Sequence, residues 1–79
     1  MRLDKYLKVS RLIKRRTVAN EACDNGRICV NGRVAKASYD VKPGDRIEIT
    51  MGAKTVAVEV LLVAETVRKD DASAMYKEI

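Results

Sequence analysis

The spacing of apolar residues changes at Gly26, and this change constrains the fold more than any other feature of the sequence. Before Gly26, apolar residues recur three or four positions apart, as at Leu3, Tyr6 and Leu7, which is the period of an amphipathic helix. After Gly26 they alternate with polar residues, as in Arg-Ile-Glu-Ile-Thr at 46–50, which is the period of a half-buried strand. Two helices followed by a small antiparallel sheet make an α+β fold, in which we expect the helices to pack on the sheet.

The first helix is predicted to turn its apolar side to the core and a basic side outward. At 100° per residue, Arg2, Lys5 and Lys8 fall opposite the apolar face. The next bases, at 11 and 14, keep a three-residue spacing that one continuous helix would wind onto its apolar side. We therefore expect a break between 10 and 13.

A second helix is expected over 15–25, closed by Gly26 in the left-handed conformation that glycine favours. Small alanines in its apolar stripe allow the two helices to approach closely. The stripe comprises Val18, Ala19, Ala22 and Cys23, and the side facing water comprises Asn20, Glu21 and Asp24.

Turn residues divide the second part of the chain into strands. Asn31-Gly32 is the dipeptide that a type I′ hairpin favours, so we expect a hairpin across it. A turn is expected over 41–45, where proline and glycine are adjacent, and a loop over 51–54. Strands are therefore predicted at 28–30, from 34, at 46–50 and at 56–60.

The C-terminal part is predicted to contain a short helix. Asp70 or Asp71 is placed to cap this helix, which is expected to extend through Tyr76. We expect residues 1–79 to form a single domain, with 1–50 as its central motif and 51–79 as the last strand and tail.

Positive charge is concentrated at the start of the chain. The first sixteen residues hold seven of the 16 Lys and Arg residues and one of the 11 Asp and Glu residues, which gives +6 within a net charge of +5. The rest of the chain is near neutral, at −1. Clustered Lys and Arg favour a polyanion, because they release condensed counterions when they neutralise phosphates. One alternative is a charged face that is merely solvated. Another is binding to an anionic membrane, but the apolar face of the first helix is too small to favour it.

Composition argues against an enzyme and against a metal site. The chain has no His, its acids are scattered, and it shows neither a Gly-rich phosphate loop nor a serine–base pair. We expect no catalytic residue, no cofactor and no metal. Cys23 and Cys29 are expected to be reduced and partly buried, although their number is compatible with one disulfide. The longest apolar run, 60–64, is too short to cross a bilayer, so a cytoplasmic protein is expected.

Aromatic content distinguishes two kinds of RNA partner. Proteins that read single strands stack bases on exposed aromatic rings. This chain has three Tyr and no Phe or Trp, which is too little for a stacking platform. We therefore expect structured RNA, recognised through its shape and its phosphates.

Four motifs follow one another along residues 1–50. They are an Arg-Leu-Asp opening at 2–4, a basic start of the second helix at Arg15 and Arg16, a Gly-x-Ile-x-Val-Asn-Gly hairpin at 26–32, and a Val-x-x-Gly-Asp turn at 41–45. In this order and spacing they resemble the S4 domain, a small RNA-binding module. The resemblance implies the alpha-L RNA-binding motif, in which two helices lie against the sheet and dock on structured RNA.

The resemblance also implies which residues contact RNA. The basic residues would contact phosphates, with Asn31 and Lys36 as additions from the sheet side; the basic set is Arg2, Lys5, Lys8, Arg11, Lys14, Arg15 and Arg16. Asp4 is expected to orient neighbouring bases or to cap the first helix. Asn20 departs from the family pattern, since many members carry Arg or Lys there, and this would weaken the hold of the second helix.

The stretch RLDKYLKVSRLIKRRT and the short tail resemble most the RqcP family of bacterial ribosome-associated quality-control factors. This resemblance implies a non-enzymatic protein, monomeric away from the ribosome, that binds rRNA of the large ribosomal subunit and peptidyl-tRNA. It would support alanine tailing of stalled chains by RqcH, which is a further expected partner. The alternatives are an RNA-binding accessory to a separate rRNA- or tRNA-modifying enzyme and a basic protein–protein adaptor.

Overall fold

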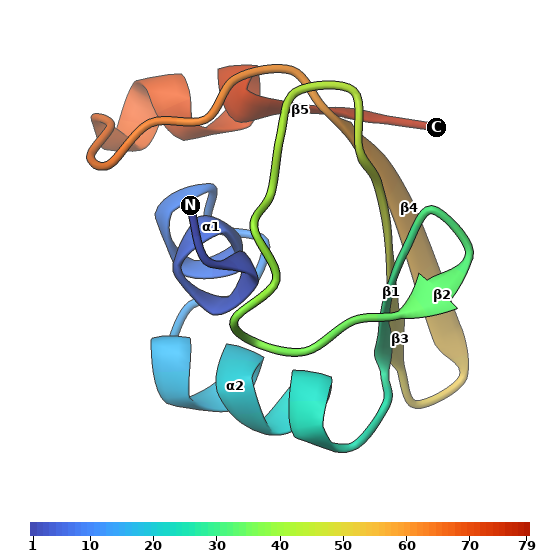
Figure 1. Cartoon of the computed structure of the whole chain (residues 1–79). Coiled ribbons are helices and arrows are strands. Elements are labelled where there is room, and N and C mark those ends of the chain that lie inside the picture. Colours follow the sequence, from blue (N-terminus) through green and yellow to red (C-terminus); the bar gives the residue numbers. More distant parts are fainter.

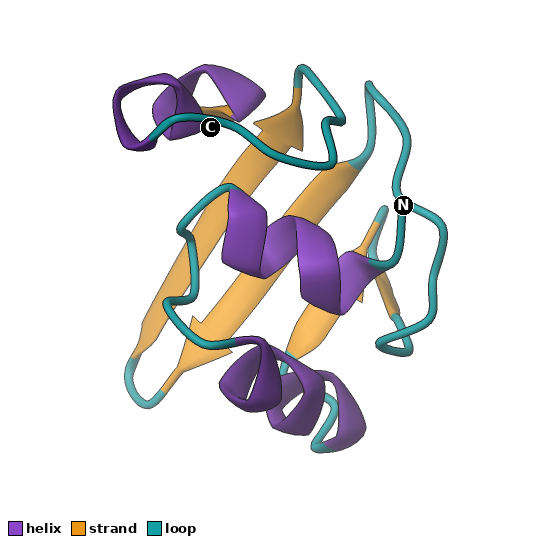
Figure 2. Cartoon of the chain, turned by 90° about the vertical axis from the view of Figure 1, so that its left-hand side faces the viewer, coloured by secondary structure: helices purple, strands orange, loops and turns teal.

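Five strands form one antiparallel sheet, and both α-helices lie on the same face of it (Figures 1 and 2). The structure, a computed structural model, describes residues 1–79. The strand order is β2-β1-β3-β4-β5, so the predicted α+β class is confirmed. In chain order the elements are α1 (Leu3–Val9), α2 (Arg16–Asp24), β1 (Ile28–Val30), β2 (Arg33–Val34), β3 (Arg46–Met51), β4 (Lys54–Val60), the 3₁₀ helix η1 (Lys69–Met75) and β5 (Tyr76–Glu78).

The predicted type I′ turn joins β1 to β2. Asn31 has φ 53° and Gly32 has φ 83°, and this turn type requires the left-handed conformation at both positions. Val30 pairs with Arg33 across the ladder, which leaves only two residues in the turn. A second hairpin, between β3 and β4, is tighter than the loop predicted over 51–54, because those end residues pair with each other.

The break between the helices falls where the charge spacing predicts it. Helix α1 ends at Val9, and residues 10–15 form the connection to α2. Gly26 closes α2 with φ 72°, and its N–H donates to the carbonyl of Cys23 at 3.0 Å. Helix α2 therefore ends where Gly26 predicts that it should.

Two predictions for the faces of α2 are wrong. Val18 is 40% exposed, because the buried side of the helix is centred on Ala19, Ala22 and Cys23 and Val18 lies at its margin. Asn20 is half-buried instead of facing water, and its side chain donates a hydrogen bond to α1. The buried face of α2 is thus rotated toward α1.

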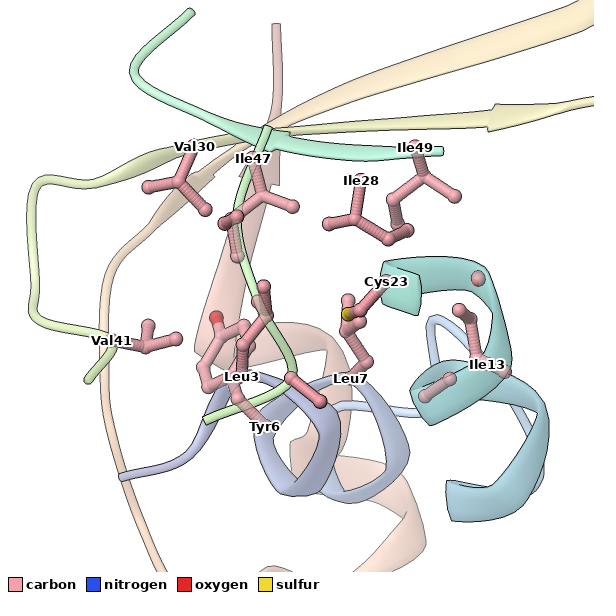
Figure 3. Close-up of a cluster of buried hydrophobic side chains, with 14 of the residues drawn as sticks. Leu3, Tyr6, Leu7, Ile13, Cys23, Ile28, Val30, Val41, Ile47 and Ile49 are labelled. Carbon is pink, nitrogen blue, oxygen red and sulfur yellow. The ribbon is translucent and has the colours of Figure 1, made fainter. Parts of the chain in front are cut away.

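The core lies between the helices and the sheet (Figure 3). Helix α1 contributes three fully buried side chains, and Tyr6 among them donates its hydroxyl to the carbonyl of Met75 at 2.7 Å. This bond satisfies the one polar atom of the ring and ties α1 to η1. The side chains that meet in Figure 3 include Leu3, Tyr6, Leu7, Ile13, Cys23, Ile28, Val30, Val41, Ile47 and Ile49.

The C-terminal segment differs from its prediction. The expected helix is the 3₁₀ helix η1, and its N-cap is Arg68, without a side-chain cap, while Asp70 and Asp71 lie in its first turn. Tyr76 begins strand β5, which pairs with β4, instead of ending the helix. A strand of three residues is too short to carry a periodic signal, and buried Met75 fixes it in place through the core.

None of the helices is both long enough and apolar enough to cross a membrane.

Candidate nucleic-acid interface

The basic residues at the start of the chain surround α1 and the connection that follows it. Arg2 is the N-cap of α1, Lys5 and Lys8 lie within it, and Arg16 begins α2. These elements form the side of the molecule that faces the viewer in Figure 2. Lys5 is half-buried, and the exposed bases are Arg2, Lys8, Arg11, Lys14, Arg15 and Arg16.

Asp4 is the centre of a first group of these residues. Its carboxylate is almost fully buried, with 2% of the residue exposed. Arg2 donates to it from Nε at 3.2 Å and from Nη2 at 3.4 Å, and Nε of Arg16 lies 3.4 Å from Oδ2. The amide of Asn20 donates at 3.3 Å, and the backbone N–H of Lys5 donates at 2.8 Å. We call Asp4, Arg2, Arg16 and Asn20 the Asp4 group.

The Asp4 group holds a charged carboxylate against two guanidinium groups. Burial raises the pKa of Asp4, but hydrogen bonds from Asn20, Arg2, Arg16 and the N–H of Lys5 together lower it below 3.8. The predicted role of Asp4 as an orienting group therefore matches the geometry, whereas Asp4 does not occupy the N-cap position of α1.

The arginine forks of the Asp4 group remain available to a ligand. Arg2 gives Asp4 the Nε–Nη2 edge of its guanidinium, which leaves Nη1 and the outer N–H of Nη2 unused. Arg16 approaches Asp4 with Nε alone. Both side chains are about half exposed, at 52% and 48%. Two parallel N–H groups at the end of a guanidinium match two oxygens of a phosphate.

Of the two additions expected from the sheet side, Lys36 lies beside the Asp4 group and Asn31 does not. Lys36 lines a shallow hollow together with Arg2. The side chain of Asn31 donates to Asp45 at 3.1 Å and accepts the N–H of Arg46 at 3.0 Å. Both ends of this amide thus hold the β1–β2 turn against the start of β3, and contact of Asn31 with RNA stays a prediction.

A second group of bases lines a groove next to the C-terminal segment. Lys8, Arg11 and Lys14 form one wall, and the other contains Glu65 and Lys69 together with residues 66 and 67. The sequence offered no signal for Lys69, because it lies far along the chain from the basic cluster and only the tertiary fold brings it beside α1. We call Lys8, Arg11, Lys14 and Lys69 the groove group.

Two of the predicted bases belong to neither group. Lys5 forms an ion pair with Glu65, and this pair links α1 to the C-terminal segment. Arg15 is the exposed N-cap of α2 and forms no ion pair. The structure therefore divides the predicted basic surface into two clusters, one near each end of α1.

The cysteines lie where the sequence predicts. Cys23 is buried on α2, and Cys29 is half-buried in β1. Burial, followed by the charges of Asp4 and Asp24, raises the pKa of Cys23 to about 11, so its thiol is protonated at neutral pH. No group of three or more His, Cys, Asp and Glu side chains is placed to hold a metal ion.

Two helices on one face of a sheet, with exposed bases on the first helix, form the arrangement that the resemblance to the S4 domain implies. The family model of the S4 domain matches residues 1–47. The structure of heat shock protein 15 from Vibrio cholerae, described as trimeric, is similar with a TM-score of 0.93 at 29% identity, covering 100% of this chain and 81% of that one.

Relatives of higher sequence identity define the family within the S4-domain proteins more narrowly. The RQC P-site tRNA stabilizing factor of Halalkalibacterium halodurans is 62% identical over 77 residues, which are 98% of this chain and 88% of that protein. The factor of the same name from Bacillus subtilis is 58% identical over 76 residues, with 96% and 88% covered. The chain belongs to this family of S4-domain proteins. The predicted resemblance to the S4 domain and to ribosome-associated quality-control factors is thereby confirmed.

Proposed function

We propose that this protein binds structured RNA without catalysing a reaction, and that it stabilises P-site tRNA during ribosome-associated quality control. The Asp4 group is the observation that carries this proposal, because it fixes two guanidinium forks on the exposed side of the helices. The names of relatives that are 62% and 58% identical support the choice of tRNA as a ligand.

The proposed mechanism is electrostatic and geometric. Phosphates of the RNA backbone meet the free ends of Arg2 and Arg16, and Lys36 adds charge beside them. Such contacts position the RNA and carry no sequence information of their own. If five to seven bases engage phosphates, log K falls against log salt with a slope of roughly −4 to −6. A protein of this kind holds a tRNA in place by contact alone.

The partners follow from the same proposal. We infer that rRNA of the large ribosomal subunit and peptidyl-tRNA are the two RNA ligands, and that RqcH is a further partner on the stalled subunit. The protein would act in the cytoplasm as one domain and as a monomer away from the ribosome. Its role would be to keep the tRNA in position while RqcH adds alanine to the stalled chain.

Charge reversal at Arg16 tests the proposal. We expect Arg16→Glu to abolish co-sedimentation with large ribosomal subunits while the far-UV circular dichroism still shows a folded protein. Its melting temperature should fall modestly, because the half-exposed side chain loses its ion pair with Asp4. Lys77→Glu is the matched control. Lys77 is exposed on β5 and lies directly opposite Glu59 of β4 in the strand register. The neighbours of Glu59, Val58 and Val60, point into the core. Lys77 therefore lies on the sheet face away from the helices.

Two results would contradict this assignment. Binding of Arg16→Glu with an unchanged salt slope would place the RNA on another face of the molecule. Sedimentation of the wild type that survives digestion of the RNA would identify a protein partner instead, as expected of a basic adaptor.

A further inference from the structure

The groove group lies at the end of α1 away from the Asp4 group, and none of its members is committed to another charge. Lys8, Arg11, Lys14 and Lys69 form no salt bridge in the structure. The acid in the groove, Glu65, is paired with Lys5. The groove therefore presents four cations that no side chain of the protein neutralises.

The backbone at Arg11 carries the second observation. Arg11 has φ 63°, a left-handed conformation that is unfavourable for a residue with a long side chain and natural for glycine. Its N–H donates to the carbonyl of Lys8 at 3.1 Å, so the strained turn is held by the end of α1. Glycine would make this turn with less strain, yet an exposed arginine occupies it. Strain of this kind concentrates at functional positions, where the side chain serves a purpose other than folding.

The pair of Lys5 and Glu65 shows how the groove is built. The hydrogen bond that Lys5 donates to Glu65 lowers the pKa of Glu65, so this carboxylate is charged at neutral pH. The pair anchors the start of the C-terminal segment beside α1, and this places Lys69, at the start of η1, opposite Lys8. Lys69 lies outside the residues 1–47 that match the S4 domain, so the second wall of the groove is an addition to that domain.

We propose that this groove is a second site for RNA phosphate backbone, distinct from the Asp4 group and completed by Lys69. The proposal rests on the proposed RNA-binding function. Helix α1 has seven residues and therefore rises about 10 Å between the two sites, so they meet different phosphates. RNA is favoured over an acidic peptide because only two of the eight lining residues are hydrophobic, and a peptide groove would offer apolar pockets for side chains.

Lys69→Gln tests the contribution of the second wall. The probes are purified large ribosomal subunits and a deacylated tRNA, and the dissociation constant is measured at several KCl concentrations. One phosphate contact changes the salt slope by about 0.7 to 0.9, which is a factor of about 5 to 8 at 0.1 M salt. We expect Lys69→Gln to weaken binding of at least one probe by this factor and to reduce its slope by about 1. Lys77→Gln, with the same change on the opposite sheet face, should leave both quantities unchanged.

Arg11→Gly tests the meaning of the strain. Release of the left-handed strain should raise the melting temperature by roughly 4 °C. Loss of the guanidinium should weaken RNA binding by about 5- to 8-fold. A protein that becomes more stable and binds less well shows that Arg11 serves binding and not folding. An equal affinity for RNA in this variant would overturn the proposal.

The outcomes distinguish the two proposals. If Arg16→Glu abolishes binding while Lys69→Gln behaves like Lys77→Gln, the groove is not an RNA site and the proposed function stands. An acidic peptide as the true occupant gives this same result. If Arg16→Glu, Lys69→Gln and Arg11→Gly all bind as the wild type does, the proposed function fails as well.

Discussion

Replacement of Asp4 by asparagine separates net charge from geometry. The change removes one negative charge, so the net charge rises from +5 to +6, and it preserves the shape of the side chain. If net charge governed RNA binding, affinity would increase. Two unit charges about 5 Å apart in water interact by about 0.8 kcal/mol, which is about fourfold in affinity. If Asp4 positions Arg2 and Arg16, affinity must instead decrease.

The expected size of the decrease follows from the contacts of Asp4. An asparagine Oδ1 still accepts the N–H of Lys5, but an amide nitrogen replaces Oδ2. That nitrogen would face the amide of Asn20 and Nε of Arg16, which are also donors. Arg16 is then released, and Arg2 keeps one of its two bonds. Loss of one phosphate contact corresponds to about 5- to 8-fold at 0.1 M salt, so we expect Asp4→Asn to bind RNA at least about fivefold more weakly.

The same substitution has a defined effect on stability. Two half-exposed ion pairs contribute modestly, and one donor facing another adds to their loss, so we expect the free energy of unfolding to fall by about 1 to 2 kcal/mol at pH 7. The pKa of Asp4 lies below 3.8 in the folded protein. Its contribution is therefore fully present above the unfolded pKa and is lost as the pH falls through the lower folded value. The wild type and Asp4→Asn should consequently converge in stability at strongly acid pH.

Glu21→Gln is the matched control for charge. Glu21 is exposed on α2 and lines a surface hollow with Asp4 and Arg16, but its side chain holds no base. It changes the net charge by the same amount as Asp4→Asn. We expect Glu21→Gln to bind RNA as well as the wild type or slightly better, by filter binding at fixed salt. A folded Asp4→Asn protein that binds as tightly as Glu21→Gln would refute the positioning role of Asp4.

Two further predictions concern the core and the thiols. Met75→Ala should lower the free energy of unfolding in urea by about 3 kcal/mol, since this fully buried side chain fixes η1 and β5 to the core; a loss below about 1 kcal/mol would show that the C-terminal segment is not part of it. Under native conditions a thiol reagent should modify half-buried Cys29 before buried Cys23, whose pKa of about 11 keeps it protonated; equal rates for the two would contradict the burial of Cys23.

The sequence predicts those parts of the fold that short segments determine. The end of α2 at Gly26 and the turn at Asn31-Gly32 depend on backbone conformations that few residues adopt, so their signals are local. Strand β5 has no such signal, because its pairing with β4 depends on burial of the preceding Met75. The exposure of Val18 depends similarly on where α1 meets α2, which periodicity within one helix does not fix.

The candidate site is predictable to the same extent. Clustering of bases in the first sixteen residues identifies which residue types are involved, and all of those bases except Lys5 are exposed. Their division into two groups was not predictable, because it depends on two acids. Asp4 binds Arg2 and Arg16, and Glu65 forms an ion pair with Lys5. Lys69 lies in the groove only because the C-terminal segment folds back beside α1.

Acidic residues on the helical side therefore do more than reduce the net charge. Two guanidinium groups side by side repel each other, and a folded protein tolerates them more easily when a buried carboxylate lies between them. The carboxylate of Asp4 offsets this repulsion, and the hydrogen-bonded Asp4 group forms when the chain folds. The side-chain order that phosphate binding requires is then present before RNA arrives, so less conformational entropy is lost on binding. The single acid among the first sixteen residues thus holds the neighbouring guanidinium groups in an arrangement that can bind phosphate.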